Sequence, residues 1–410
     1  MSERVELVVV GAGAAGLMAA IWAGRAGARP VVLDGARVLG AKILVAGGGR
    51  CNVTHDVVDE RGFAGSTPPA IRNVLRRFDV ARTVAFFAEL GVELKREQTG
   101  KLFPVTDDAH TVLDALLAAA RGAGAELRHP WRVQSVRPEG DGYVVAGTGG
   151  EIAARRVILA TGGKSVPRSG SDGAGLEIAR ALGHSVTARV VPALVGITLA
   201  DGCFVRALSG LSTEATVEVR SGTGKRLRAF TGSTLCTHFG LSGPAPMDIS
   251  RHWLHASADD PGARLVVRWL PDETPATLDA ALRRLSDETV ARFLSRRLPA
   301  RLARALCDEA GVDPTTAGHV LTREQRHALV YAALDAPLPI TGTRGWNHAE
   351  ATAGGVPLAE VRLATMESRH APGLFLCGEL LDVDGRIGGY NFQWAWSSGF
   401  VAGSGAGASH

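Results

Sequence analysis

The chain has 410 residues, of which 46% are hydrophobic and 21% charged, so it should fold as one large or two to three modest globular domains. Its formal net charge is only +4, and no basic run is dense enough to predict a nucleic-acid-binding face. The uncharged stretch 7–24 contains four glycines and begins like a strand, which disfavours a membrane span, and the acidic start disfavours a signal peptide.

The five cysteines are scattered along the chain with no CxxC pair, which predicts free thiols and a cytoplasmic protein. They are Cys51, Cys203, Cys236, Cys307 and Cys377. His252 and His255 could share one face of a helix, but no further ligand completes a set. We therefore predict no metal site.

The first segment that indicates a ligand-binding turn is an apolar strand, residues 8–10, which is followed by a glycine turn and a helix. Gly11 permits a tight turn, Gly13 permits close approach of a diphosphate, and Gly16 permits close packing of the helix. Asp34 ends the next apolar strand, where a carboxylate can accept a hydrogen bond from a ribose hydroxyl. The pattern predicts a βαβ unit that binds a dinucleotide.

A glycine-rich segment follows at residues 40–54, with three consecutive glycines at 47–49. Such a run does not suit the interior of a helix or strand. Lys42, Arg50 and Asn52 add cations and an amide at the same place, which favours a loop lying against a ligand. A flexible surface loop is the alternative interpretation.

The next part of the chain predicts further helices and strands, and one of these strands ends in a second candidate ligand-binding turn. Residues 71–90 predict one amphipathic helix, and Asp107 or Asp108 is expected to cap the helix that follows. Residues 131–136 and 143–146 predict two strands joined through a glycine turn. The apolar strand that begins at residue 156 ends in Thr161 and Gly162, where a doubly wound sheet would bind its ligand.

From residue 192 the pattern of hydrophobic and polar residues changes. Alternating segments at 194–199, 213–219, 227–231 and 265–269 predict an antiparallel or barrel-like insert, with a short helix at 247–252. Arginine-rich amphipathic helices follow at 278–285, 289–298, 302–310 and 323–333. We therefore predict a discontinuous FAD-binding domain at 1–191 and 357–410, an inserted β domain at 192–271 and 336–356, and an inserted helical domain at 272–335.

The third candidate ligand-binding turn follows the apolar strand at 373–377, which ends in Gly378 and Glu379. A glycine loop and a closing helix at 392–401 come next. Together with the strand end at Thr161, this late turn favours FAD over NAD alone. The predicted fold class is α/β, a glutathione-reductase-type FAD-binding Rossmann-like fold with the two inserts. In such folds the last helix directs its N-terminus at the flavin pyrimidine ring.

These segments resemble the BaiN/RdsA (YhiN-like) family of NAD(P)/FAD-dependent oxidoreductases, which are three-domain bacterial flavoproteins. The matching stretches include GAGAAGLMAA, GAKILVAGGGRCNVTH, ILATGGKSVPRSGSDGAGLEIARALGH and GLFLCGELLDVDGRIGGYNFQWAWSSG. The resemblance implies bound FAD. It also implies that FAD contacts come from Gly11, Gly13, Ala14, Ala15, Gly16, Asp34, Lys42, Gly48, Gly49, Arg50, Cys51, Asn52, Val133, Thr161, Gly162, Gly378, Glu379, Asp382, Gly389, Tyr390, Asn391 and Phe392.

No catalytic acid or base follows from the pattern. The candidates are Tyr390, Glu350 and Arg50. Tyr390 could donate a proton or simply stack, and Glu350 could face the active site or be a satisfied charge at a domain junction. Cys51 could be redox-active, but it lacks a resolving partner at CxxC spacing, which favours a packing role.

The expected function is an FAD-dependent oxidoreductase that moves a hydride through flavin N5 to or from an unidentified small organic substrate. Because no second strand–GxGxxG–helix unit occurs, NAD(P)H would visit only transiently as the donor. The alternatives are an oxygen-using amine-type flavin oxidase, a flavin-free NAD-dependent dehydrogenase, and a non-enzymatic flavoprotein that senses and binds a partner. Neither a membrane nor a nucleic acid is an expected partner, and the oligomeric state stays open.

Overall fold

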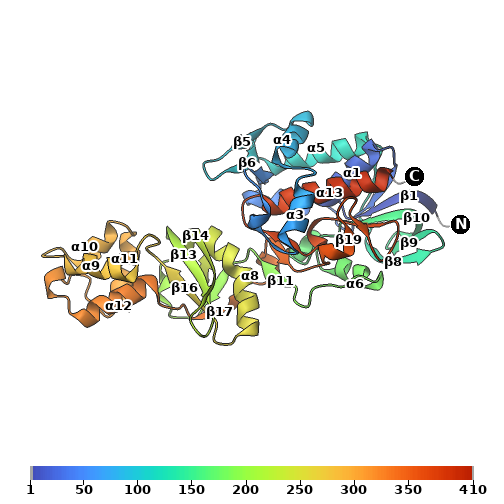
Figure 1. The fold of residues 1–410 in the computed structure, drawn as a ribbon. Coiled ribbons are helices and arrows are strands. Elements are labelled where there is room, and N and C mark those ends of the chain that lie inside the picture. The colour runs from blue at the N-terminus through green and yellow to red at the C-terminus, as the bar shows by residue number, and fades with distance from the viewer. Residues whose placement is uncertain (1–2, 409–410) are drawn as a thin grey trace. The chain divides into compact units, whose positions relative to one another are not determined.

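The structure is a computed structural model that describes residues 3–408, and the chain divides into two compact units (Figure 1). The first unit comprises Met1–Pro192 and Ala349–His410, and the second comprises Ala193–His348. No helix within residues 3–408 is long and apolar enough to cross a membrane.

A mostly parallel sheet forms the centre of the first unit. In spatial order it comprises β19 (Val361–Arg362), β20 (Glu367–Ser368), β21 (Leu374–Leu376), β10 (Gly150–Leu159), β1 (Glu3–Val10), β2 (Pro30–Leu33) and β7 (Glu126–Arg128). A hairpin of β8 (Val133–Glu139) and β9 (Gly142–Gly147) pairs with the first half of β10. Val8 and Val9 in β1 are fully buried, as expected of a central parallel strand.

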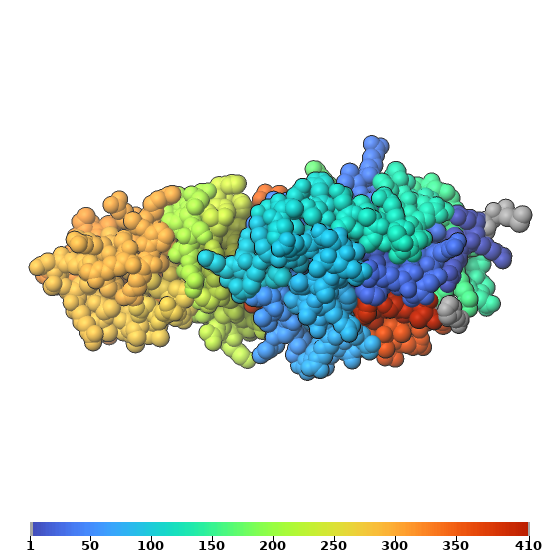
Figure 2. All heavy atoms as spheres, turned by 90° about the horizontal axis from the view of Figure 1, so that it is seen from above, coloured from blue at the N-terminus to red at the C-terminus, as the bar shows by residue number. Residues whose placement is uncertain are grey.

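Two helices from opposite ends of the chain, α1 (Ala14–Arg25) and α13 (Tyr390–Ala408), pack closely against each other (Figures 1 and 2). A Cβ atom built on Gly403 would lie 2.2 Å from the Ala19 carbonyl oxygen, so the approach requires glycine. Gly399 meets Ala15 and Gly403 meets Ala19, in the same order along both helices. The helices are therefore parallel, and the N-terminus of α13 extends about 12 Å beyond that of α1.

Smaller elements surround this core. The other helices of the first unit are α2 (Ala41–Val45), α3 (Pro68–Leu75), α4 (Val80–Glu89), α5 (Ala109–Gly122) and α6 (Ala174–Ala181). The short strands are β3 (Thr54–His55), β4 (Phe63–Gly65), β5 (Leu94–Arg96), β6 (Lys101–Pro104), β18 (Ala351–Ala353) and β22 (Val383–Gly385), and β11 (Val191–Ala193) leads into the second unit.

The single helix predicted for residues 71–90 is wrong, because the chain forms α3 and α4 there. The Asp79 carboxylate accepts a hydrogen bond from the Arg82 N–H (2.9 Å) and starts the second helix as its N-cap. Apolar side chains of both helices are buried, so the pattern continues across the break. The cap predicted at Asp107 or Asp108 is Asp108, which accepts from the His110 N–H at 2.9 Å.

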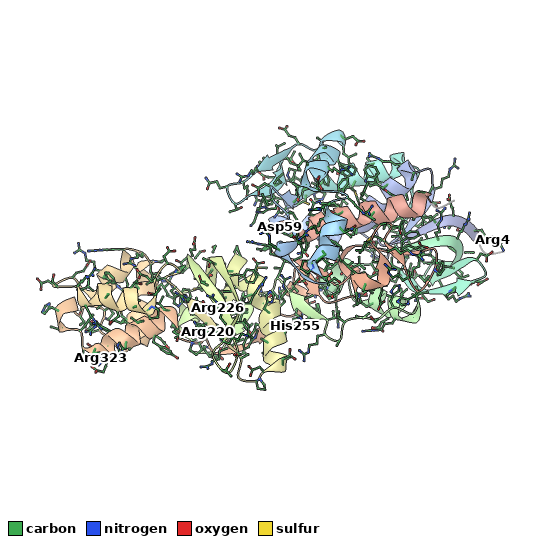
Figure 3. All side chains as sticks on the ribbon, in the orientation of Figure 1. Arg4, Asp59, Arg220, Arg226, His255 and Arg323 are labelled. Atoms are coloured by element: carbon green, nitrogen blue, oxygen red, sulfur yellow. The ribbon has the colours of Figure 1, made fainter. Side chains whose placement is uncertain are left out.

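The second unit combines a barrel-like sheet with helices. Its strands, in spatial order, are β16 (Arg264–Arg268), β13 (Ser212–Arg220), β14 (Arg226–Thr237), β15 (Gly240–Ser242), β12 (Ile197–Leu199) and β17 (Ile340–Thr343). The Leu338 N–H just before β17 donates to the Leu265 carbonyl of β16 at 3.0 Å, which closes the sheet on itself. Arg220 and Arg226, labelled in Figure 3, belong to the paired strands β13 and β14.

The helices of the second unit are α7 (Phe204–Ala207), α8 (Pro244–Asp259), α9 (Pro275–Arg283), α10 (Val290–Ser295), α11 (Ala300–Glu309) and α12 (Arg323–Leu334). Two predicted lengths are wrong. The short helix at 247–252 is part of α8, because Pro244 suits its first turn. The closing helix runs from Tyr390 to Ala408 rather than 392–401, because its glycines pack on α1 instead of ending it.

The predicted fold class is confirmed: the central sheet and its flanking helices form the Rossmann-like part, and the barrel-like sheet and the helices form the inserts. The division into five sequence segments stays a prediction.

Candidate cofactor site

The predicted strand ends meet at one edge of the central sheet. Val10 of β1 pairs with Leu33 of β2 and Leu159 of β10, and Leu159 pairs with Leu376 of β21. All four strands are parallel, so the turns that follow them lie side by side. This is the edge at which doubly wound sheets bind ligands.

The glycine turn after β1 is held by close backbone contacts. A Cβ atom on Gly16 would lie 1.8 Å from the Gly11 carbonyl oxygen, whereas one on Gly13 would meet no described atom within 4 Å. Within residues 3–408, no side chain caps the N-terminus of α1, and its first turn holds no acid. The N–H groups at Ala14 and Ala15 therefore have no capping side chain among the described residues, which suits a diphosphate.

Asp34 lies where a ribose-binding acid is expected, and backbone groups fix its carboxylate. One oxygen accepts from the Ala12 N–H (2.6 Å) and the other from the Ala36 N–H (2.7 Å). Each oxygen retains a lone pair for a ribose hydroxyl. The Asp34 carbonyl also accepts from the Trp131 N–H (2.6 Å), which brings β8 and its first residue, Val133, to the same edge.

Thr161 and Gly162 follow β10 and lie beside the first turn. A Cβ atom on Gly11 would be 3.4 Å from the Thr161 Cα, and one on Gly162 would be 2.8 Å from the Ser171 hydroxyl oxygen. That hydroxyl is buried, and no described residue forms a hydrogen bond with it. An unpaired buried hydroxyl here fits a site completed by a ligand.

A polar network connects Lys42 to Glu379. The Lys42 ammonium donates to Glu379 Oε2 and to the Ser165 hydroxyl (both 2.7 Å), and that hydroxyl donates to Glu379 Oε1 (2.7 Å). Burial alone would raise the pKa of Glu379, but the Lys42 charge and the hydroxyls of Thr352 and Ser165 hold it below its ordinary value. The carboxylate is therefore ionised at neutral pH.

Ser165 and Thr352 belong to this network but were not predicted. The Thr352 hydroxyl oxygen accepts from the N–H groups of Lys164 and Ser165 (2.8 and 3.1 Å), and thereby fixes the loop after β10. The one available signal was the position of Ser165, just past the glycines that follow a predicted strand end.

The glycine-rich segment begins as α2 and ends in a tight loop. Gly47, Gly48 and Gly49 have φ angles of 58°, 70° and 88°, which explains the run of glycines. Cys51 beside them is fully buried, and burial raises the pKa of its thiol to about 12. The thiol is therefore protonated at neutral pH, which supports packing rather than redox chemistry.

Asn52 ties this loop to the start of α13. With its amide nitrogen facing the carbonyls of Thr54 (2.9 Å) and Leu102 (3.2 Å), its oxygen accepts from the Gly389 N–H at 3.1 Å. Two segments that the resemblance predicts to contact FAD thus touch each other directly.

At the N-terminus of α13, Asn391 closes its own loop through two hydrogen bonds to the backbone of Gly385, and Phe392 stacks on Trp396. Asp382 differs from its neighbours. Burial raises the pKa of its carboxyl, and nothing within the described chain donates a hydrogen bond to it. A half-buried acid without a donor fits contact with a ligand hydroxyl.

The three catalytic candidates lie in different surroundings. The Tyr390 hydroxyl donates to the Val57 carbonyl at 3.1 Å. Arg50 pairs with Glu97 (2.7 Å) and covers the Phe103 ring at 4.1 Å. Glu350 is exposed, and its role stays a prediction.

The residues fit a flavin dinucleotide. The uncapped first turn of α1 and the open space at Gly13 suit a diphosphate, while Ser171 and Asp382 offer polar groups that the chain itself leaves unpaired. The N-terminus of α13 provides a positive dipole about 12 Å beyond the diphosphate turn. Individual contacts with the cofactor stay predictions.

His184, Glu360 and His370 form the one group in residues 3–408 that has metal-ligand spacing. The Ser368 hydroxyl oxygen accepts from the N–H groups of His370 and Ala371, so its proton points at His184 Nε2 (2.9 Å). The proton of His184 then lies on Nδ1 and is donated to Glu360 at 2.8 Å. Both ring nitrogens of His184 are therefore engaged within the chain, Nε2 as an acceptor and Nδ1 as a donor. A metal-ligating histidine normally donates from one nitrogen and binds the metal with the other, so these hydrogen bonds satisfy the cluster without a metal.

The model of the family described as HI0933-like protein Rossmann domain matches residues 5–405. The chain belongs to this family. One HI0933-like relative, named 3-dehydro-bile acid delta(4,6)-reductase from Clostridium scindens, is 36% identical over 404 residues, which cover 97% of this chain and 98% of that protein. Another, named ribosomal RNA dihydrouridine synthase from Escherichia coli, is 32% identical over 403 residues, 97% of each protein.

A solved structure of similar fold is that of 3-ketosteroid delta1-dehydrogenase from Sterolibacterium denitrificans, with a TM-score of 0.54 and 13% identity over 99% of this chain and 100% of that one. The predicted family is therefore confirmed for this chain. The chain is an FAD-type oxidoreductase with a Rossmann dinucleotide-binding fold.

Proposed function

We propose that the chain is a flavin-dependent reductase that saturates a carbon–carbon double bond conjugated to a carbonyl group. The observation that carries the proposal is the chemistry shared by two full-length relatives. A delta(4,6)-reductase of a 3-dehydro bile acid and a dihydrouridine synthase both reduce such a bond, although one substrate is a sterol acid and the other an RNA base. The proposal therefore specifies the bond rather than the molecule that contains it.

When bound, FAD supplies the hydride chemistry. We assign the N–H groups of α1 to the diphosphate, Asp34 to the ribose and Asp382 to a hydroxyl of the ribityl chain. Lys42 and Glu379 hold the strand end after β21 against the loop after β10. Their paired charges keep this part of the site polar without adding net charge.

NAD(P)H is the proposed reductant. The sequence contains one strand–GxGxxG–helix unit, which supports a nicotinamide that visits transiently rather than one held by its own domain. The proposed compartment is the cytoplasm, a location supported by five free cysteines, four of which are buried.

The test uses purified holoprotein reduced anaerobically with NADH or NADPH. The reduced protein is mixed with a conjugated cyclic enone, and reoxidation of the flavin is followed by its absorbance. A saturated ketone and an unconjugated alkene of the same ring size are the controls. We expect rapid reoxidation by the enone and none by either control.

Two outcomes would contradict the proposal. Reduction of the flavin by an amine, with uptake of oxygen on return to air, would support the amine-type oxidase instead. A flavin that no nicotinamide or amine reduces would support a non-enzymatic flavoprotein.

A further inference from the structure

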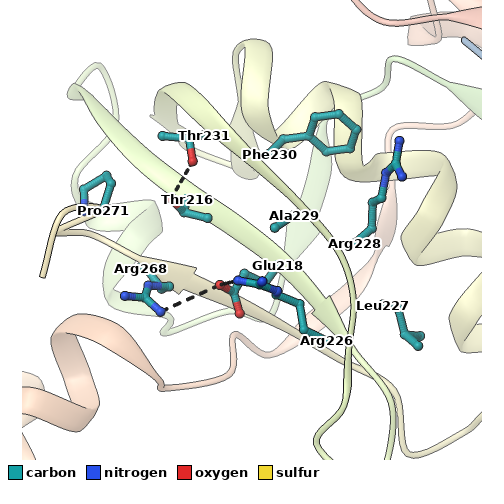
Figure 4. A pocket seen from close by; sticks show the side chains of 10 residues that line it. All are labelled: Thr216, Glu218, Arg226, Leu227, Arg228, Ala229, Phe230, Thr231, Arg268 and Pro271. Atoms are coloured by element: carbon teal, nitrogen blue, oxygen red, sulfur yellow. Dashed lines mark hydrogen bonds and ion pairs between the residues drawn. The ribbon is translucent and has the colours of Figure 1, made fainter. Parts of the chain in front are cut away.

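A cavity of about 590 Å³ opens on the barrel-like sheet of the second unit (Figure 4). We call it the arginine pocket and define it by Thr216, Glu218, Arg226, Arg228, Thr231 and Arg268. Its volume lies within the range of small-molecule binding sites. These residues come from the adjacent strands β13, β14 and β16, so the pocket belongs to this unit alone.

Glu218 is the acid of the arginine pocket, and it is only 2% exposed. Arg220 supplies its hydrogen bonds, with nitrogen–oxygen distances of 2.9 and 3.0 Å. Arg226 and Arg268 approach the other carboxylate oxygen only to 3.7 and 3.9 Å, beyond hydrogen-bond distance. Arg220 thus satisfies Oε2, whereas Oε1 has only the longer ion-pair contacts with Arg226 and Arg268, which leave the hydrogen-bond donors of these two guanidinium groups unused.

Arg226 and Arg268 lie on either side of Glu218 in Figure 4. The Arg226 side chain is 65% exposed and donates no hydrogen bond within the described residues. Arg268 donates to the Glu273 carbonyl through one nitrogen and keeps its remaining donors. Two guanidinium groups with unused donors thus border one cavity.

The surroundings are positively charged. Arg220 is also paired with Asp335, so these two charges cancel, and three arginines in the lining face one glutamate. Burial, together with the charges of Arg251 and Arg228, lowers the pKa of His252 to about 3. His252 stacks on Phe230 of β14 and is therefore neutral at physiological pH.

A hydroxyl pair completes the lining. The Thr216 and Thr231 hydroxyl oxygens are 2.7 Å apart on neighbouring strands (Figure 4). Arginine guanidinium groups match the oxygens of a phosphate in pairs, and the hydroxyl of this pair that accepts from the other keeps its own proton for the same group. A surplus of two positive charges matches a phosphate dianion better than a single carboxylate.

We propose that the arginine pocket binds the phosphate group of a nucleotide. The ligand would be either a free nucleotide or the 5′-terminal nucleotide of an RNA strand, since both present a phosphate monoester with two negative charges. The inference goes beyond the reductase proposal, because it concerns a separate unit and needs no redox step.

The experiment measures binding to the flavin-loaded protein by two probes. The first is AMP, followed by calorimetry. The second is a 5′-phosphorylated single-stranded RNA of about twelve nucleotides with a fluorescent label at its 3′ end, followed by anisotropy. Inorganic phosphate and butyrate serve as competitors. The variants are Arg226→Glu and Arg268→Gln, and the matched control is Arg323→Glu, an exposed arginine of α12 away from the pocket (Figure 3).

We expect Arg226→Glu and Arg268→Gln each to weaken binding about tenfold, while Arg323→Glu binds like the wild type. For RNA, the salt dependence of binding should fall by about one unit in Arg226→Glu. Phosphate should compete and butyrate should not. Saturation by AMP with no gain from RNA assigns the pocket to free nucleotides, and binding of RNA without AMP assigns it to a strand.

The proposal is overturned if neither probe binds, if butyrate competes as well as phosphate, or if Arg323→Glu loses as much affinity as Arg226→Glu. Flavin absorbance and reduction of the cyclic enone should be unchanged in all three variants. A failure of phosphate binding is thus distinguishable from a failure of the proposed reductase activity.

Discussion

The two ends of the candidate cofactor site differ in composition: backbone groups form one end, and side chains form the other. At the end proposed to bind the diphosphate, the site consists of backbone groups of residues 11–16, and Gly16 packs so closely that a single methyl group would overlap the Gly11 carbonyl. At the other end, side chains from distant segments form a network of Lys42, Ser165, Thr352 and Glu379. Substitutions at the first end should therefore act through shape, and at the second through charge and hydrogen bonding.

The largest effect is expected at Gly16. Gly16→Ala places a Cβ atom 1.8 Å from the backbone oxygen of Gly11, so the backbone must shift. We expect the free energy of unfolding of the apoprotein to fall by about 3 kcal/mol, despite a gain in helix propensity of about 1 kcal/mol. Urea unfolding followed by circular dichroism measures the change.

Gly13→Ala is the matched control, because the same methyl group there meets open space in the described chain. Its apoprotein should differ from the wild type by less than about 1 kcal/mol, while its affinity for FAD, measured by quenching of flavin fluorescence, should fall. Equal stability losses in both variants would contradict the distinction between the packed and the open face of this turn.

The charge pair at the other end should give the next largest effect. Lys42→Met or Glu379→Gln leaves one charge without its partner in a site where the two side chains are 25% and 19% exposed. We expect each to lower the free energy of unfolding by about 2 kcal/mol, and the double variant to lose less than the sum. The exposed pair Arg137–Glu151, 50% and 52% exposed, is the control, with an expected coupling below about 1 kcal/mol.

The same pair predicts a pH dependence. Because the folded-state pKa of Glu379 lies below its ordinary value of 4.5, its contribution to stability is present above pH 4.5 and is lost as the pH falls through the folded pKa. Glu379→Gln has no such group. The stability difference between the wild type and this variant should therefore shrink in acid, and a difference that grows would contradict the ion pair.

This contrast explains what the sequence could predict. Gly16 packs against Gly11 within the same turn, so a six-residue motif identifies this turn, although Gly11 also packs against Ala160 at the end of β10. The strand ends at Thr161 and Gly378 were also predictable, because apolar runs that end in glycine identify them. By contrast, Ser165 meets Glu379 across 214 residues, and only the parallel pairing of β10 with β21 brings the segments that follow these strands to one edge.

The arginine pocket shows the same limit. Arg226 and Arg268 are far apart in the sequence, and no basic run connects them, so the charge pattern predicted no nucleic-acid-binding face and did not indicate this pocket. They flank one glutamate because β13 pairs with β14 on one side and with β16 on the other. The break between α3 and α4 was missed for another reason: the Asp79 cap was visible, but the continuous apolar pattern outweighed it.

Asp382 should show a smaller effect that separates cofactor binding from stability. Its pKa is raised by burial, so ionisation opposes folding of the apoprotein as the pH rises above the unfolded value. Asp382→Asn removes that charge and should leave the apoprotein as stable or slightly more stable at neutral pH. Its affinity for FAD should fall about tenfold, because an amide is a weaker acceptor for a hydroxyl. A variant with wild-type affinity would exclude contact with the cofactor.

Tyr390→Phe should give the smallest effect. The hydroxyl already donates to the Val57 carbonyl, and the ring contacts Phe63 at 5.7 Å and His55 at 5.5 Å, contacts that phenylalanine preserves. Loss of one hydrogen bond should lower the free energy of unfolding by about 1 kcal/mol and change turnover of the enone by less than about threefold. A loss of turnover of about a hundredfold, with stability little changed, would instead identify Tyr390 as the proton donor. Because the ring stays in place in this variant, the loss of turnover compared with the loss of stability decides between stacking and proton transfer at the reacting end.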